Sequence, residues 1–232
     1  MTRPGRLDTA AVFEQIFAIY RRQAAVLLPA AAVLYVAPSA LDLAHGVSAR
    51  ALSLAAAVIA GVWYQGLVVQ AVRDIQDGVR DLSVGGLFRS VSPVLAPLLW
   101  TAILVGAGVF LGILAFIIPG LVLLTQWAVA APVVVIEKRT AVQAIGRSRE
   151  LVRGHGWQVF SVLIVTLMII LIADTALVTV AAAISDTRGA FAVANFVARV
   201  LTGPIFGLSS AVLYLELRKL KGEPLLAAGV LT

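Results

Sequence analysis

The sequence contains no cysteine among its 232 residues. This absence excludes a disulfide framework, a thiolate metal site and a cysteine nucleophile. Charged residues are scarce as well, because they make up 13% of the chain, against about 25% in an average soluble domain. The two histidines, His45 and His155, lie far apart and cannot form a histidine metal cluster by themselves. We therefore expect neither a metal nor a cofactor.

Motifs of catalysis are also absent from the sequence. There is no Walker loop, no GxGxxG, no GxSxG and no HExxH. Gly85-Gly86 and the glycines Gly154 and Gly156 are adequately explained as turn residues. A lipid hydrolase within the membrane would need a cluster of acids or an acid–histidine pair, and the sequence indicates none. We expect a protein that is not an enzyme and has no catalytic residues.

Apolar residues dominate what is present. They make up 61% of the chain, against about 45–50% in a soluble domain, which indicates an integral membrane protein. The mean hydropathy of +1.00 points the same way. From Pro93 to Ile136 there is no charge in 44 residues. At 1.5 Å per residue this run gives a helix of about 66 Å, too long for one crossing of a core of about 30 Å. The run must form a hairpin, and Ile118-Pro119-Gly120 is its strongest breaker.

The whole chain, residues 1–232, is predicted to be one all-α membrane domain, a bundle of six spans. The spans are expected at about 23–44, 51–72, 93–117, 119–136, 157–184 and 193–216. Three amphipathic surface helices are expected at about 8–22, 83–91 and 140–153. Each surface helix precedes a pair of spans, so we interpret the chain as three copies of one unit, a surface helix followed by a transmembrane hairpin.

Lysine and arginine orient these spans. Fifteen of the 18 lie in segments 1–22, 73–92, 137–156 and 216–232, whereas the loops on the other side hold two. Because cytoplasmic loops carry the excess of Lys and Arg, we expect an inner-membrane protein with both termini and all three surface helices in the cytoplasm. The net charge of +6 then indicates contact with anionic lipid headgroups rather than with nucleic acid.

Two groups of residues are candidate sites. Asp174 and Arg199 are charged residues inside predicted spans, where each costs about 2.5–3.5 kcal/mol on insertion scales, so they should form an intramembrane pair. That pair is either structural or part of a transport path. At the cytoplasmic face, Glu137 lies close in sequence to Arg147, Arg149 and Arg153. These four residues form either a structural ion-pair cluster or a headgroup site.

The central part of the chain resembles a family of prokaryotic multi-pass membrane proteins. The likeness lies in Ile118-Pro119-Gly120, Trp127, Ala131-Pro132-Val133-Val134-Val135, Glu137, Ala144-Ile145, Arg147-Ser148, Leu151-Val152, Gly154 and Trp157, and near the end in Leu213-Tyr214-Leu215-Glu216-Leu217-Arg218 with Gly222-Glu223. The family is labelled glycerophosphoryl diester phosphodiesterase membrane domain. The resemblance implies a six-span bundle of unassigned activity, whose label comes from fusions to a catalytic domain that we expect to be absent here. Glu216 stands where an aspartate is more usual.

These observations lead to two hypotheses of function. The first is a non-enzymatic membrane protein that organises anionic lipids or partner proteins, including a second copy of itself, at the cytoplasmic face. The alternative is a small transporter or channel that uses Asp174 and Arg199 in a pathway beside a sixth span kinked at Gly203-Pro204.

Overall fold

The computed structural model describes residues 7–44, 46–76, 84–185 and 187–223, and in these ranges the chain is helical with no strand. The helices are α1 (Thr9–Leu41), α2 (Val47–Gln76), α3 (Val84–Val91), the short 3-10 helix η1 (Ser92–Val94), α4 (Leu95–Ala115), α5 (Ile117–Gln126), α6 (Ala130–Glu137), α7 (Ala141–Val152), α8 (Gly156–Ile184) and α9 (Arg188–Leu220). The all-α prediction is confirmed.

Within the described residues, six helical stretches are long and apolar enough to cross a membrane. They are Thr9–Leu41, Val47–Ile75, Val84–Ala115, Ile117–Glu137, Gly156–Ile184 and Arg188–Leu220. Their number is the number of spans expected from the hydropathy of the sequence. The chain is therefore of the multi-pass membrane class.

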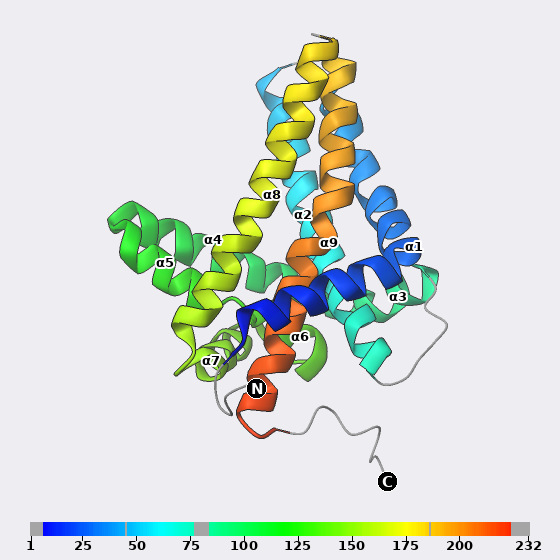
Figure 1. Ribbon diagram of the computed structural model, residues 1–232. Helices are drawn as coiled ribbons and strands as arrows, with labels where there is room; N and C mark the ends of the chain where they lie inside the picture. The colour runs from blue at the N-terminus through cyan, green and yellow to red at the C-terminus, as the bar shows by residue number, and fades with distance from the viewer. Residues whose placement is uncertain (1–6, 45, 77–83, 186, 224–232) are drawn as a thin grey trace.

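Four of these helices form the tall part of the molecule. Figure 1 shows α1, α2, α8 and α9 rising together, with α9 in the middle of the fold. α9 packs against α1, α2 and α8 along its length and reaches α6 and α7 at its C-terminal end. Its segment from Leu208 to Leu215 is almost fully buried, so the core of the protein follows this helix.

α4 and α5 form a hairpin that projects to the side of the tall part (Figure 1). Glycine permits close contact between the two helices, since a Cβ added at Gly108 would meet the ring of Trp127 at 2.4 Å, and one added at Gly112 would meet the backbone of Gly120 at 2.9 Å. Gly108 and Gly112, four residues apart, thus form the contact face of α4. Most other side chains of the hairpin are exposed and apolar.

The position of the hairpin turn differs from the prediction. Phe116 alone separates the two helices, with extended backbone, and Pro119 and Gly120 already lie in the first turn of α5. Proline is tolerated there because the first N–H groups of a helix have no partner within it. Gly120 allows α5 to pack closely against α4 and is not part of the turn.

The predicted fourth span, 119–136, is interrupted. Residues 127–129 form a turn between α5 and α6. The buried hydroxyl of Ser148 on α7 donates to the carbonyl of Gln126 at 2.8 Å and accepts from the N–H of Val129 at 3.3 Å. One side chain thus satisfies backbone groups on both sides of the break, which a buried helix end requires.

The first predicted surface helix, 8–22, is not a separate element. It is continuous with the first span in α1, which begins after Asp8, whose carboxylate accepts from the N–H groups of Ala10 and Ala11. Figure 1 shows this first part of α1 lying across the lower end of the bundle before the helix rises. No helix-breaking signal separates residue 22 from residue 23, so the helix continues.

The other two surface helices are close to their predicted ranges. α7 begins after Thr140, whose backbone N–H donates to the side chain of Gln143 at 3.2 Å, and ends before Gly154, which has a φ of +92°. Thr140 and Gln143 thus form a capping box at the start of α7. α3 covers Val84–Val91, and Ser83, the first residue of the predicted range, lies outside the described residues.

The second of the three predicted units differs from the other two. Its returning segment, Ile117–Glu137, has 21 residues and is broken into α5 and α6, whereas the returning helices α2 and α9 are unbroken and have 30 and 33 residues. The second unit thus differs from the other two in its interrupted returning segment and in the hairpin that projects to the side.

Candidate functional site

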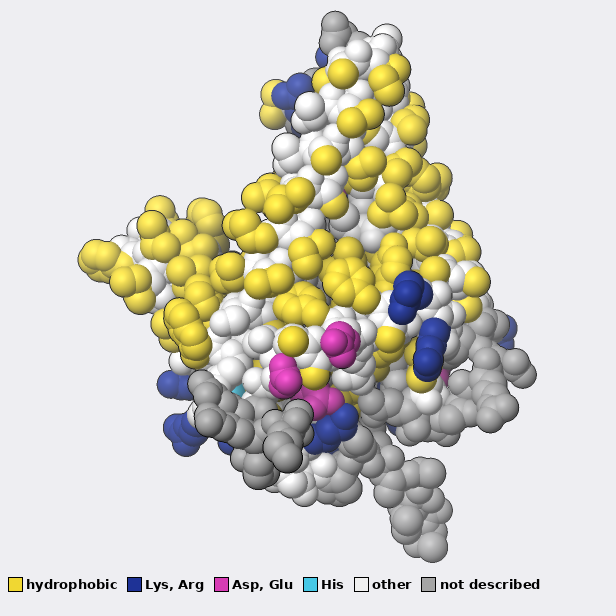
Figure 2. All heavy atoms as spheres, viewed as in Figure 1, with side chains coloured by type: hydrophobic (Ala, Val, Ile, Leu, Met, Phe, Trp, Pro, Cys, Tyr) yellow, Lys and Arg dark blue, Asp and Glu magenta, His cyan; other side chains and the backbone are white. Residues whose placement is uncertain are grey.

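Charged side chains gather at one end of the molecule, the end that carries α7 and the C-terminal part of α9, which we call the basic end. Figure 2 shows apolar side chains over the hairpin and the tall part, and basic and acidic side chains below them. The four residues predicted there as one site, Glu137, Arg147, Arg149 and Arg153, fall into two separate groups.

The first group is a closed set of hydrogen bonds and ion pairs, which we call the ionic ring. The Glu137 carboxylate accepts from the hydroxyl of Tyr214 at 3.0 Å and from the Nε atom of Arg147 at 3.3 Å. Its other oxygen lies 2.7 Å from the Nε atom of Arg139. The Glu137 side chain is only 13% exposed, so these partners compensate most of the cost of removing its charge from water.

Glu223 closes the ring from the other side. Its carboxylate pairs with Arg147 and accepts from the Nε atom of Arg218 at 3.1 Å. Arg218 in turn donates to the hydroxyl of Tyr214 at 3.2 Å. Burial by itself would raise the pKa of Glu223, but the hydrogen bonds and charges of Arg147 and Arg218 outweigh it and lower that pKa.

Local sequence explains how these side chains meet. Tyr214 and Arg218 are four residues apart on α9, so they share one face. Gly222 has a φ of +70°, and the N–H groups of Gly222 and Glu223 donate back to the carbonyls of Lys219 and Arg218. This is the Schellman arrangement, in which a left-handed glycine ends the helix and turns the chain back. The carboxylate of Glu223 is thereby returned to the ring.

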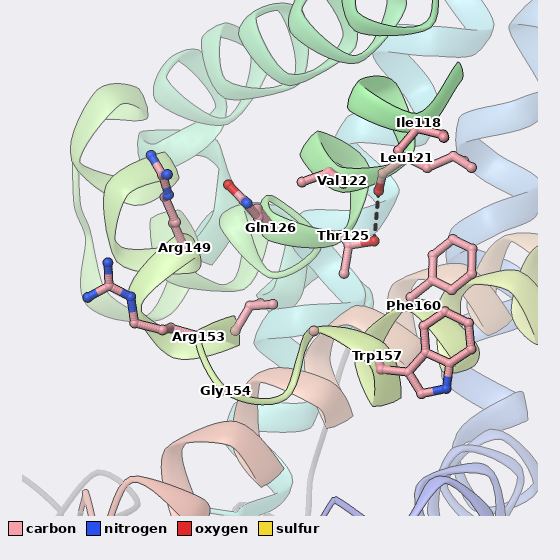
Figure 3. A pocket seen from close by; sticks show the side chains of 12 residues that line it. Ile118, Leu121, Val122, Thr125, Gln126, Arg149, Arg153, Gly154, Trp157 and Phe160 are labelled. Atoms are coloured by element: carbon pink, nitrogen blue, oxygen red, sulfur yellow. Dashed lines mark hydrogen bonds between the residues drawn. The ribbon is translucent and has the colours of Figure 1, made fainter. Parts of the chain in front are cut away.

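The second group lines a cavity of about 510 Å³ between α5, α7 and α8, which we call the α5/α7/α8 cavity. Ile118, Leu121 and Val122 of α5 and Trp157 and Phe160 of α8 give it apolar walls. Arg149 and Arg153 of α7 also line it. Figure 3 shows the two guanidinium groups on one side and the two aromatic rings on the other.

The polar groups of this cavity differ in whether they have partners. The hydroxyl of Thr125 donates to the carbonyl of Leu121 at 2.8 Å, as the dashed line in Figure 3 marks, and so adds little polarity. No carboxylate in the described part of the chain forms an ion pair with Arg149 or Arg153. Both arginines are exposed. The cavity therefore has apolar walls and uncompensated positive charge at one side.

The division of the arginines follows from helix geometry. Arg149 and Arg153 are four residues apart and share a face of α7, whereas Arg147 is two residues from Arg149 and points to the opposite face. The spacing that places these arginines on different faces of α7 is present in the sequence. The apolar half of the cavity and the participation of Tyr214, Arg218 and Glu223 in the ring depend on α5, α8 and α9, which only the fold brings together.

The predicted intramembrane pair needs correction. Arg199 forms its ion pair with Asp42, at 3.3 Å, rather than with Asp174. Ser53 donates to the same Asp42 carboxylate and holds it in place. Asp174 lies close enough to interact with Thr202 and with the charge of Arg199. The reason is the long contact between α1 and α9, which places the C-terminal end of α1 beside Arg199.

Among the described residues, no group of three or more histidine, aspartate or glutamate side chains is arranged to hold a metal ion. No family model, no curated protein and no solved structure matches the chain. The class that the fold and these sites define is thus an all-helical, multi-pass membrane protein with an ionic ring and an arginine-lined cavity at one end. The resemblance to the glycerophosphoryl diester phosphodiesterase membrane-domain family stays a prediction.

Proposed function

We propose that the protein is a non-enzymatic membrane component that organises anionic lipids at the cytoplasmic face of the inner membrane. The observation that carries this proposal is the uncompensated charge of Arg149 and Arg153 beside an apolar cavity. A lipid with an anionic headgroup matches both features, because its phosphate is negatively charged and its acyl chains are apolar.

The ionic ring supports the proposal because it shows which arginines are bound to carboxylates and which are available to a ligand. Arg147 and Arg218 are bound to the carboxylates of Glu137 and Glu223, so they offer little to a ligand. Arg149 and Arg153 lie outside this arrangement. A basic residue near an anionic membrane surface contributes about 1 kcal/mol, so a few such residues suffice to enrich anionic lipid around the protein.

The proposed orientation of the protein in the membrane rests on the distribution of lysine and arginine along the sequence. The basic end carries α7 and the C-terminal end of α9, which belong to the segments with the excess of lysine and arginine. Under the positive-inside rule this end faces the cytoplasm. The anionic lipids of the inner leaflet are then the nearest ligands.

The alternative, a transporter or channel using Asp174 and Arg199, is favoured less by the geometry. Arg199 is held in an ion pair with Asp42, and neither Arg199 nor Asp174 lines the α5/α7/α8 cavity or the two smaller cavities in the tall part of the molecule. An arginine fixed by a neighbouring carboxylate fits a structural role between α1 and α9 better than a role in a pathway.

Native mass spectrometry of the detergent-purified protein tests the proposal. The protein is incubated with equal amounts of phosphatidylglycerol and phosphatidylcholine of identical chains, and the retained lipids are counted. We expect the anionic lipid to be retained preferentially, and the preference to fall at high salt because charge screening weakens the contacts. Equal retention of the two lipids at low salt would overturn the proposal.

A further inference from the structure

The α5/α7/α8 cavity combines apolar walls with positive charge. Its walls on α5 and α8 are apolar, and its side on α7 carries two arginines four residues apart that have no carboxylate partner among the described residues. Its volume of about 510 Å³ lies in the range of about 300–1,000 Å³ that small-molecule sites occupy. It is therefore large enough for part of a lipid molecule.

We propose that this cavity is a specific site for one anionic diacyl phospholipid. The phosphate binds to Arg149 and Arg153, and the beginning of an acyl chain lies between α5 and α8 against Trp157 and Phe160. The inference rests on the proposed function and adds to it the place, the number of molecules and the class of ligand.

The arginines suit a phosphate in charge and in shape. A guanidinium group offers planar, paired N–H donors that match phosphate oxygens, which a lysine ammonium does not. The carbonyl of Arg153 accepts from the Nζ atom of Lys221 at 3.0 Å, so a third cation adjoins this side of the cavity. An anion placed here would meet positive charge from both α7 and the end of α9.

The aromatic side suits the upper part of an acyl chain. The rings of Trp157 and Phe160 lie 5.5 Å apart, and Trp157 is 75% exposed although it is large and mostly apolar. Tryptophan is enriched at the level of lipid headgroups because its ring is apolar and its N–H is polar. Gly154, with a φ of +92°, turns the chain between α7 and α8 so that Arg153 and Trp157 line the same cavity.

Fluorescence quenching by lipids with brominated chains tests the site through Trp157. Protein is reconstituted in phosphatidylcholine with a small fraction of brominated phosphatidylglycerol or, separately, brominated phosphatidylcholine. We expect the brominated anionic lipid to quench the wild-type emission more strongly. This extra quenching should disappear in Trp157→Phe and remain in Trp100→Phe, because Trp100 is an exposed tryptophan of α4 outside the cavity.

The arginines are tested in the same assay. Replacing both, Arg149→Gln with Arg153→Gln, should lower the preference for the anionic lipid at Trp157 by about tenfold or more, since two contacts of about 1 kcal/mol each are lost. The matched control, Arg21→Gln with Arg22→Gln, removes the same charge from exposed positions on α1 and should leave the preference unchanged. Circular dichroism and size-exclusion elution show that each variant is folded.

The outcomes separate the site from the proposed function. If native mass spectrometry shows the anionic preference but Trp157→Phe keeps the selective quenching, lipid is organised elsewhere and the cavity is not its site. An unchanged preference in the double arginine variant overturns the role of Arg149 and Arg153. If neither experiment detects a preference, both the site and the proposed function fall.

Discussion

At the scale of single residues, Glu137 is the group on which the ionic ring depends. It is the last residue of α6 and joins α7 through Arg147 with α9 through Tyr214. Lys138, which follows, has the left-handed φ of 52° that turns the chain toward α7. A carboxylate at this corner therefore connects the consecutive helices α6 and α7 with α9, which is distant in sequence.

Glu137→Gln should destabilise the protein. The amide can still accept from Tyr214, but Arg139 loses its carboxylate partner and Arg147 loses one of its three. A partly buried group left without its partner costs about 1–3 kcal/mol. The measurement is thermal unfolding in detergent. The control is Glu150→Gln, the same chemical change in a side chain that is 71% exposed and lies 3.5 Å from Arg147, where a loss below about 0.5 kcal/mol is expected. Equal effects of the two substitutions would contradict the role of the ring.

Glu223 makes the ring sensitive to acid. Its pKa in the folded protein is lowered, so its contribution to stability is complete above the ordinary glutamate pKa of about 4.3 and is lost as the pH falls through the folded pKa. We expect Glu223→Gln to unfold at a lower temperature than the wild type at pH 7. This difference should close as the pH is lowered below about 4. A difference that stays constant with pH would show that the charge of Glu223 is not the cause.

At the scale of elements, the α4–α5 hairpin is defined by the close contact of its two helices. A Cβ at Gly120 would lie 2.2 Å from Cγ1 and 2.6 Å from the backbone nitrogen of Ile113. Because this nitrogen belongs to the backbone of α4, a side chain at position 120 fits only if the two helices move apart. The hairpin is therefore held by van der Waals contact, as is usual for helices in lipid.

Gly120→Leu should destabilise the hairpin by about 1–3 kcal/mol, the usual cost of overpacking. Thermal unfolding in detergent, with the emission of Trp127 as a local probe, measures the effect. Gly106→Leu is the matched control on α4, because no atom lies within 4 Å of a Cβ added there. A hairpin that tolerates leucine equally at both positions would refute the importance of the contact.

The length of α5 predicts where the tip of the hairpin lies. The returning stretch Ile117–Glu137 is long enough to cross a membrane, but residues 127–129 interrupt it. Its first straight part, the 10 residues of α5, extends about 15 Å, half of a hydrocarbon core of about 30 Å. We expect the tip at Phe116 to remain inside the bilayer, and not to form the external loop that six full crossings require. A cysteine at Phe116 should resist a membrane-impermeant maleimide from both sides. Labelling of this cysteine in intact cells would show a complete crossing instead.

At the scale of the whole molecule, the decisive property is the separation of charge between the two ends. The basic end carries the ionic ring and the α5/α7/α8 cavity, and the opposite end carries Arg50 and Arg188, which line a smaller cavity. The hairpin begins and ends on the basic side whether or not it crosses fully. The orientation of the other long helices therefore does not depend on it.

The orientation can be tested directly, because the chain has no cysteine to remove. Val142→Cys on α7 and Val47→Cys at the start of α2 are both at exposed positions, on opposite ends. An impermeant maleimide should label Val47→Cys in intact cells and Val142→Cys only after permeabilisation. The reverse pattern would place the basic end outside and remove the basis of the proposed function.

Several features of this protein were determined by the sequence alone. Its helical class and the number of long apolar helices follow from the apolar runs, and the bounds of α7 follow from Thr140, Gln143 and Gly154. The spacing of Gly108 and Gly112, which form the contact face of α4, is likewise a local feature of the sequence. Each of these signals acts within a few residues of itself, through capping, backbone conformation or transfer into lipid, so neighbours in the chain suffice to predict it.

The tertiary structure alone decided which distant groups meet. In the folded protein Arg199 pairs with Asp42 rather than with Asp174, and Glu223 completes the ionic ring. Arg149 and Arg153 do not contact Glu137 but line a cavity whose other walls are α5 and α8. Helix periodicity says which side chains share a face, but not which other helix that face will meet. That choice depends on the packing of all the helices at once, which no local segment of the sequence contains.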